Sequence, residues 1–147
     1  APNHNSYDRF STGAHAPTAI NWGYENRTTA IRIPGGPDIA KRIEHRVAGG
    51  DANPYLVLAS ILGAAINGME SKMEPEEPIS GDGYTSGGVS IIKDWKKSIE
   101  CFSNSQQIKK IFDPLLIRSF VDCKKQELDY FKDKSYNHII QTTINAI

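Results

Sequence analysis

The sequence predicts an α+β fold: short antiparallel strands in roughly the first 50 residues pack on a buried helix, and a helical half follows. Segments that are β-branched or alternate in polarity, bounded by Gly or Pro, all lie before residue 50. A long apolar segment with a helix-start signal comes next. Beyond residue 90, apolar residues recur at helical spacing with lysines between them. We expect one fragment, residues 1–147, without an internal domain boundary.

The first third alternates between turns and short strands. Turn-forming residues predict a loop over residues 3–17 and a short strand over Thr18–Trp22. Thr28–Ile33 is the clearest strand, and the proline- and glycine-rich residues 34–37 end it. Lys41–Val47 alternates strictly, which places three charged side chains on one strand face: Arg42, Glu44 and Arg46.

A central helix follows the strands. Asn53 and Pro54 provide an N-cap and a first-turn proline, and the helix is expected to run to about Lys72. Because its apolar residues lie on nearly all sides, we expect it to be buried. Two prolines then predict a long loop over Glu74–Gly88.

Helical spacing dominates the rest of the chain. The expected helices are Ile92–Phe102, Gln106–Phe112, Leu115–Lys132, which follows the cap-plus-proline pair Asp113-Pro114, and Tyr136–Ile147. The expected apolar stripe of the third of these consists of Leu116, Phe120, Leu128 and Phe131.

Charge and cysteine content exclude several classes of protein. With 17 basic and 17 acidic residues the net charge is zero, which argues against a nucleic-acid or membrane-surface binder. The longest apolar run, Leu56–Met69, is too short to span a bilayer. A disulfide between Cys101 and Cys123 stays open, but two scattered thiols are more typical of a reducing cytosol, so we expect a cytoplasmic protein.

Arginine is concentrated before residue 50. Five of the six arginines lie there: Arg9, Arg27, Arg32, Arg42 and Arg46. Guanidinium groups bind carboxylate and phosphate oxygens through paired hydrogen bonds, and several in one place repel one another unless an anion lies among them. Such groups suit phosphoryl transfer, which depends mostly on positioning and charge neutralisation. Glu44 between two of them suits a ligand of Mg²⁺ or Mn²⁺.

A structural alternative stays open for the same residues. An Arg-x-Glu-x-Arg strand face is often only a ladder of cross-strand ion pairs, and one carboxylate does not make a metal site. Arg27 and Arg32 have opposite strand parity, so both face one site only if the strand begins after Arg27 or contains a bulge. His15, in a Gly-Ala-His-Ala-Pro loop, suits proton transfer or is an ordinary exposed histidine.

Five blocks of sequence, in this order and spacing, resemble the C-terminal part of the catalytic domain of the glutamine synthetase family. The blocks are Asn5–Arg9, Trp22–Arg27, Arg32–Pro34, Arg42–Arg46 and Asp51–Leu56. The resemblance extends from about Asn3 to Lys132 and implies an ATP- and Mg²⁺-dependent (or Mn²⁺-dependent) ligase. Such enzymes convert glutamate to γ-glutamyl phosphate, which ammonia or another amine then attacks.

The resemblance also implies a role for each block. Arg9 and Arg46 would bind glutamate, and Glu44 would ligate the metal. ATP and the transferred phosphoryl group would contact Arg27, Arg32 and Arg42.

The sequence departs from the family pattern at His15, where glutamine synthetases proper have a glutamate that forms the ammonium site. We therefore expect a larger amine acceptor, as in the γ-glutamylpolyamine synthetases, with His15 and Arg27 as catalytic residues. Ile39, where some members have a basic nucleotide contact, weakens the nucleotide side slightly. The family's other metal ligands and its N-terminal domain are expected upstream, and its active sites form between subunits of a ring. We expect the chain alone to be inactive; the alternative is a non-catalytic phosphate-binding or assembly module.

Overall fold

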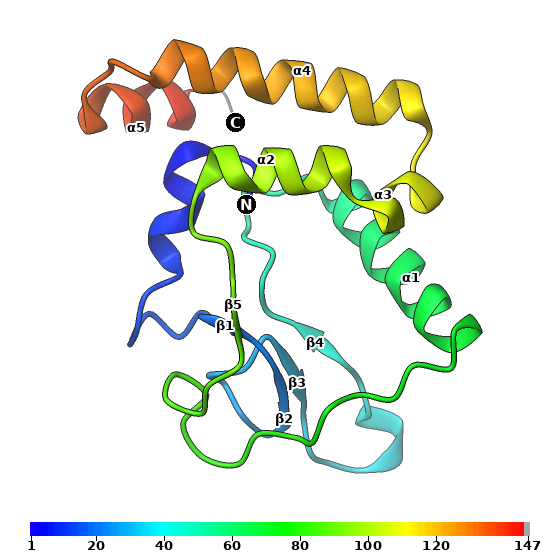
Figure 1. The fold of residues 1–147 in the computed structure, drawn as a ribbon. Helices are drawn as coiled ribbons and strands as arrows, with labels where there is room; N and C mark the ends of the chain where they lie inside the picture. Colours follow the sequence, from blue (N-terminus) through cyan, green and yellow to red (C-terminus); the bar gives the residue numbers. More distant parts are fainter. Residues whose placement is uncertain (146–147) are drawn as a thin grey trace. The chain divides into compact units, whose positions relative to one another are not determined.

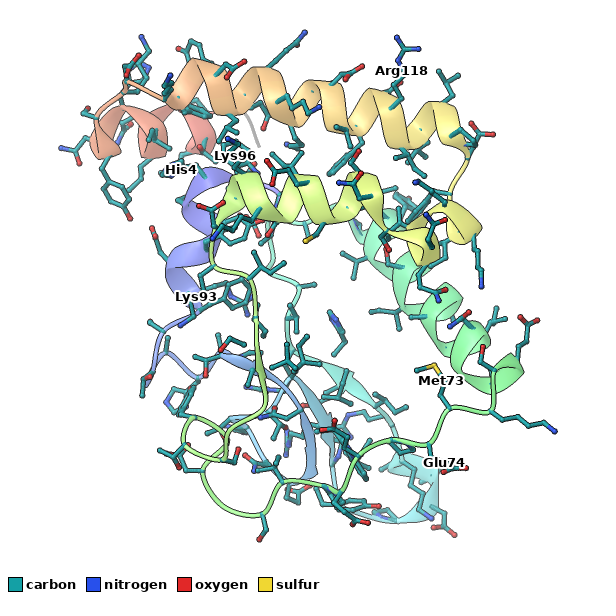
Figure 2. All side chains as sticks on the ribbon, in the orientation of Figure 1. His4, Met73, Glu74, Lys93, Lys96 and Arg118 are labelled. Atoms are coloured by element: carbon teal, nitrogen blue, oxygen red, sulfur yellow. The ribbon has the colours of Figure 1, made fainter. Side chains whose placement is uncertain are left out.

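The computed structural model describes residues 1–145, which form two compact units, drawn in Figure 1. The helical unit consists of Ala1–Tyr7, Gly50–Met73 and the described chain from Asp94, and the strand unit consists of Asp8–Gly49 and Glu74–Lys93. Figure 2 labels Met73 and Glu74, where the chain leaves the helical unit, and Lys93, the last residue of the strand unit. Short strands together with several helices confirm the α+β class.

Two small sheets form the strand unit. One contains β2 (Trp22–Tyr24), β3 (Ile31–Ile33) and β4 (Glu44–His45), in that order, and the other pairs β1 (Ala19–Ile20) with β5 (Val89–Ser90). The expected strands occur but are two or three residues long, and β5 lies where no strand was predicted.

The expectation of purely antiparallel strands is wrong for one pair. β1 pairs antiparallel with β5, and β3 with β4, but β2 and β3 are parallel. The short connection between them is held by asparagine side chains. Asn26 Oδ1 accepts from the Thr28 N–H at 3.0 Å, and Asn21 Oδ1 accepts from the Ala30 N–H at 3.1 Å. These bonds take the place of a longer crossover, because side-chain amides satisfy the backbone of the turn.

The helices of the helical unit begin close to the predicted residues. They are α1 (Pro54–Glu70), α2 (Trp95–Asn104), α3 (Gln106–Ile111), α4 (Pro114–Phe131) and α5 (Tyr136–Ile144). Asn53 caps α1 and Asp113 caps α4 through backbone N–H groups, as predicted. α2 starts three residues later than predicted because Asp94 is its cap. None of the helices within residues 1–145 is long and apolar enough to cross a membrane.

Two further predictions need correction at the chain ends. The predicted loop over residues 3–17 contains a 3-10 helix, η1 (His4–Arg9), whose Ser6 hydroxyl accepts from the Asn3 N–H at 3.0 Å. The predicted last helix ends at Ile144, and Ile147 lies outside the described residues.

Packing of α2 against α4 forms the core of the helical unit (Figure 1). Its buried residues are Trp95, Ile99, Ile117 and Val121, with Leu128 and Phe131 packed against them. The predicted stripe on α4 is therefore wrong at Leu116, which is exposed while its neighbour Ile117 is buried. A 3.6-residue period leaves such a one-residue rotation open when adjacent positions are both apolar.

The prediction that α1 is buried is wrong for this chain. One side packs on α3, where a Cβ on Gly63 would lie 2.5 Å from Ile111 Cγ1. The other side is exposed, and its apolar residues recur every three or four positions: Tyr55, Leu58, Leu62, Ile66 and Met69. The apolar pattern was read correctly, but no part of the described helical unit covers this side. That the strands pack on α1 stays a prediction.

Candidate functional site

Glu44 lies at the centre of a cluster of arginines in the strand unit. It pairs directly across the β3–β4 ladder with Arg32, whose Nη1 donates to Glu44 Oε2 at 3.0 Å. Arg42 Nη2 donates to Glu44 Oε1 at 3.1 Å, and Arg46 Nη1 lies 3.9 Å from Oε2. The alternation of Lys41–Val47 thus places two guanidiniums beside the Glu44 carboxylate, and Arg32 of β3 adds a third. The Arg32–Glu44 pair is the cross-strand ion pair of the structural alternative.

The charges of this cluster stabilise one another. Partial burial disfavours the ionised form of Glu44, but hydrogen bonds and charges from Arg32 and Arg42 outweigh it, so the Glu44 pKa is lowered. Burial likewise disfavours the cationic Arg32, and its carboxylate partners more than compensate, which raises the Arg32 pKa. The Arg32 side chain is only 13% exposed, so its guanidinium is held in a defined orientation.

Glu25 is a second carboxylate partner of Arg32. Arg32 Nη2 donates to Glu25 Oε2 at 3.2 Å, and the Gly35 backbone N–H donates to Glu25 Oε1. The Gly35 hydrogen bond and then the Arg32 guanidinium lower the Glu25 pKa. Glu25 has φ of 51°, a left-handed conformation that is uncommon outside glycine. Glu25, in the turn after β2, thus has a disfavoured backbone conformation and binds both β3, through Arg32, and the turn after β3, through Gly35.

An open pocket of about 670 Å³ lies beside these residues in the strand unit. It is lined by residues 24–27, by Arg32 and by residues 78–81. Both Arg27 and Arg32 reach it because β3 begins at Ile31, after Arg27, which is the first of the two conditions set by strand parity. Among residues 1–145, the Arg27 side chain has no hydrogen bond or ion pair that would divert it from the pocket.

The second wall of the pocket is a loop attached to β2. The Ile79 N–H donates to the Trp22 carbonyl at 2.7 Å, and Trp22 Nε1 donates to the Glu76 carbonyl at 2.6 Å. Asn26 Nδ2 donates to the Gly81 carbonyl at 2.8 Å. Gly23 permits this approach, because a Cβ there would lie 2.7 Å from the Ile79 carbonyl oxygen.

Arg9 and Arg46 bind backbone carbonyls rather than lining this pocket. Arg9 donates to the carbonyls of Val47 at 2.6 Å and Arg46 at 3.3 Å. Arg46 Nη2 donates to the carbonyls of His15 and Arg27, each at 2.7 Å. His15 itself is exposed with φ of 53°, and its carbonyl links it to the cluster. The structure therefore brings Arg32, Arg42, Arg46 and Glu44 together, while Arg9 and His15 meet them only through backbone atoms.

Donor chemistry in the cluster fits an anion. The Nε–H groups of Arg32 and Arg46 are buried and have no acceptor within the described chain. An unmade hydrogen bond at a buried charged group is unfavourable, so a small shift of these side chains that brings the Nε–H groups to an oxyanion would be favoured.

A metal ion fits only in part. Glu44 is a suitable hard oxygen ligand, yet residues 1–145 contain no group of three His, Cys, Asp or Glu side chains able to hold a metal. Within the described residues the cluster offers the carboxylates of Glu44 and Glu25, and both are shared with guanidiniums.

Sequence reasoning missed Glu25 and the loop over residues 76–81. Glu25 stands in the Trp22–Arg27 block beside Arg27, and its carboxylate is the signal that was available for it. The loop gives no such signal, because the side chains of Trp22 and Asn26 bind its backbone carbonyls, which any residue has, more than 50 positions along the chain.

The arrangement can be compared with known proteins. Residues 1–142 match the family described as glutamine synthetase, catalytic domain. The chain is similar to a gamma-glutamylethanolamide synthetase of Streptomyces coelicolor, with 38% identity over 131 residues, 89% of this chain and 28% of that protein. A gamma-glutamylputrescine synthetase of Escherichia coli is 36% identical over 132 residues, 90% of this chain and 28% of that protein.

A solved structure of a GmaS/ADP complex resembles the fold with a TM-score of 0.79 and 25% identity, over 98% of this chain and 35% of that chain. The chain thus spans less than a third of the length of the two curated relatives.

Proposed function

Because the chain belongs to the glutamine synthetase family, we propose that it is part of an ATP-dependent ligase that joins glutamate to an amine through γ-glutamyl phosphate. The observation that carries the proposal is the pocket lined by Arg27 and Arg32, next to a cluster whose buried Nε–H donors lack an acceptor. The solved GmaS structure contains ADP, which supports a nucleotide as the anion.

Each arginine has a distinct task in this proposal. Arg27, Arg32 and Arg42 bind phosphate oxygens and neutralise the charge that develops during transfer. Arg46 and Arg9 bind glutamate; the Arg46 Nε–H has no acceptor within residues 1–145 but is buried, so the Arg46 side chain has to turn to present it. ATP would supply the phosphoryl group that converts the glutamate side-chain carboxylate to an acyl phosphate, from which phosphate leaves when the amine attacks the acyl carbon.

Glu44 is proposed to ligate Mg²⁺ or Mn²⁺ together with groups from outside this chain. The test is Glu44→Gln in the full-length protein, meaning this chain with any sequence encoded together with it. We expect a higher metal concentration for half-maximal activity. Asp38→Asn is the matched control, because the Asp38 carboxylate is 92% exposed and pairs with Lys41 in the same unit. Unchanged metal dependence in Glu44→Gln removes Glu44 from the ligand set.

The amine is proposed to be larger than ammonium. Both named relatives carry ethanolamide or putrescine in their names, and this chain has His15 where a carboxylate would attract a small cation. Phosphate release should be compared with glutamate plus ammonium, putrescine or ethanolamine. If ammonium is the best acceptor, the role given to His15 is wrong.

The isolated chain is proposed to be inactive, and the exposed apolar side of α1 supports this. A stripe of five apolar residues exposed by 50–81% is typical of a helix that another part of the same domain covers. The matched part is only 28% of each of the two curated relatives. We propose that the full-length protein forms a ring with active sites between subunits, as the resemblance to the family implies.

A non-catalytic module that binds phosphate ligands or promotes assembly is the alternative. Carboxylate and His metal ligands in upstream sequence support the enzyme. Their absence from a full-length sequence supports the module.

A further inference from the structure

We propose that Glu25 is a positioning residue, which keeps the Arg32 guanidinium at the pocket when Glu44 is engaged by a divalent cation. This inference rests on the proposed function. Glu25 is not itself placed in contact with reacting atoms; it acts through Arg32.

The hydrogen-bonding fork of Arg32 is divided between two carboxylates. Nη1 donates to Glu44 at 3.0 Å and Nη2 donates to Glu25 at 3.2 Å. A guanidinium has five N–H donors, so three remain, and the Nε–H among them has no acceptor within residues 1–145. The two carboxylates therefore fix the orientation of Arg32 and leave donors for an anion.

The Glu25 carboxylate is itself anchored. Its Oε1 accepts the backbone N–H of Gly35, in the turn that follows β3, while Oε2 accepts from Arg32. Its backbone adopts φ of 51°, a conformation that residues with a side chain rarely adopt unless surrounding contacts impose it. One carboxylate oxygen is thus bonded to Arg32 of β3 and the other to the turn that follows this strand.

Glu25 and Glu44 would respond differently to a cation. A metal at Glu44 draws on the same oxygens that now accept from Arg32 and Arg42, which weakens one of the two fixed points of Arg32. Glu25 accepts from Nη2, the other terminal nitrogen of Arg32, and so maintains the second fixed point. A long side chain held in advance loses less conformational freedom when it binds phosphate, so affinity for the nucleotide rises.

Removing the Glu25 charge also has an opposing effect, because a negative charge near the pocket repels phosphate. The carboxylate is 59% exposed, so water and salt screen this repulsion strongly. The hydrogen bond to Arg32 is a direct contact and is screened less. The loss of order in Arg32 is therefore expected to dominate.

The experiment compares Glu25→Gln, Glu25→Ala and the control Asp38→Asn in the full-length protein. The measurements are the Kd for ADP by calorimetry, the KM for ATP and for glutamate, kcat and the melting temperature. Glutamine keeps an oxygen for the Gly35 N–H but loses the ionic partner of Arg32. We expect Glu25→Gln to raise Kd and KM for nucleotide about 5- to 10-fold, with glutamate KM within about 2-fold and only a small fall in the melting temperature. Glu25→Ala should add a lower melting temperature, and Asp38→Asn should match the wild type.

Three outcomes overturn the proposal. Wild-type Kd and KM for nucleotide in Glu25→Gln show that Arg32 needs no positioning by Glu25. Equal rises in both KM values with a lower melting temperature show a purely structural role. A wild-type protein that binds no nucleotide removes the ligand that Arg32 is said to bind. If the wild type binds ADP but releases no phosphate with glutamate, the ligase proposal fails alone, and the ADP Kd of Glu25→Gln still decides the role of Glu25.

Discussion

Replacement of Gly23 by alanine tests whether β2 fixes the loop that forms the second wall of the pocket. A Cβ at this position would lie 2.7 Å from the Ile79 carbonyl oxygen and 3.2 Å from Asn26 Cβ. The first of these atoms belongs to the backbone, so a side-chain rotation does not relieve the contact. Either β2 or the loop over residues 76–81 has to shift.

The size of the effect follows from these contacts. Overpacking of one methyl group costs about 1–3 kcal/mol. The lower entropy of the unfolded chain on replacing glycine returns about 0.4–1 kcal/mol. The net loss is about 1–2 kcal/mol if the loop moves slightly. Two loop hydrogen bonds, from the Ile79 N–H and from Trp22 Nε1, add about 0.5–1.5 kcal/mol each if they break.

Urea unfolding of this chain, followed by tryptophan fluorescence, measures the loss. Gly50→Ala is the matched control, because no atom lies within 4 Å of a Cβ at Gly50 and its backbone conformation suits alanine. We expect Gly50→Ala to unfold at or slightly above the wild-type midpoint and Gly23→Ala clearly below it. ADP affinity of the full-length Gly23→Ala protein should fall as well, because residues 78–81 line the pocket. Equal midpoints for the two variants with equal urea dependence would refute the reasoning.

Three further predictions concern both units. Gly63→Ala, at the contact of α1 with α3, should destabilise this chain by about 1–2 kcal/mol in urea unfolding. Gly68→Ala, in the same helix but with open space around it, should stabilise the chain by about 0.5–1 kcal/mol. The reverse order would contradict the α1–α3 packing. Leu62→Lys should reduce self-association of the isolated chain in sedimentation experiments and destabilise the full-length protein, and an unaffected full-length protein would show that α1 stays uncovered. The pKa values of Glu25 and Glu44 are lowered from 4.5 in the folded state, so the stabilisation that these carboxylates provide is complete above pH 4.5 and is lost as the pH falls through the lowered values. Glu25→Gln should therefore make the free energy of unfolding depend less steeply on pH on the acid side. An unchanged slope there would contradict the ion pairs.

Local signals in the sequence were sufficient for the starts of α1 and α4. The caps at Asn53 and Asp113, each followed by proline, act within one turn of the helix, so the pattern contains all the information that the start needs. The charged face around Glu44 was predictable for the same reason, because alternation along one strand determines which side chains share a face.

Long-range partners were not predictable in the same way. The parallel pairing of β2 and β3 depends on the side chains of Asn21, just before β2, and Asn26, in the turn after it, and strand propensity does not determine direction. An apolar pattern identifies α1 as a helix that needs covering but does not say which part of a polypeptide covers it. The contact of Arg32 with two carboxylates was likewise unpredictable, because Glu25 and Glu44 are separated in the sequence and meet its Nη2 and Nη1 only in the fold.

The most direct test of the proposed ligase traps its activated glutamate. Hydroxylamine is a strong nucleophile that converts an acyl phosphate to a hydroxamate, so it replaces the amine in an assay of the full-length protein with glutamate, ATP and Mg²⁺. We expect γ-glutamyl hydroxamate and phosphate in equal amounts, with both lost in Arg32→Ala and retained in Asp38→Asn. ATP hydrolysis without hydroxamate, or full hydroxamate formation by Arg32→Ala, would contradict the claim that these arginines serve transfer of phosphate to glutamate.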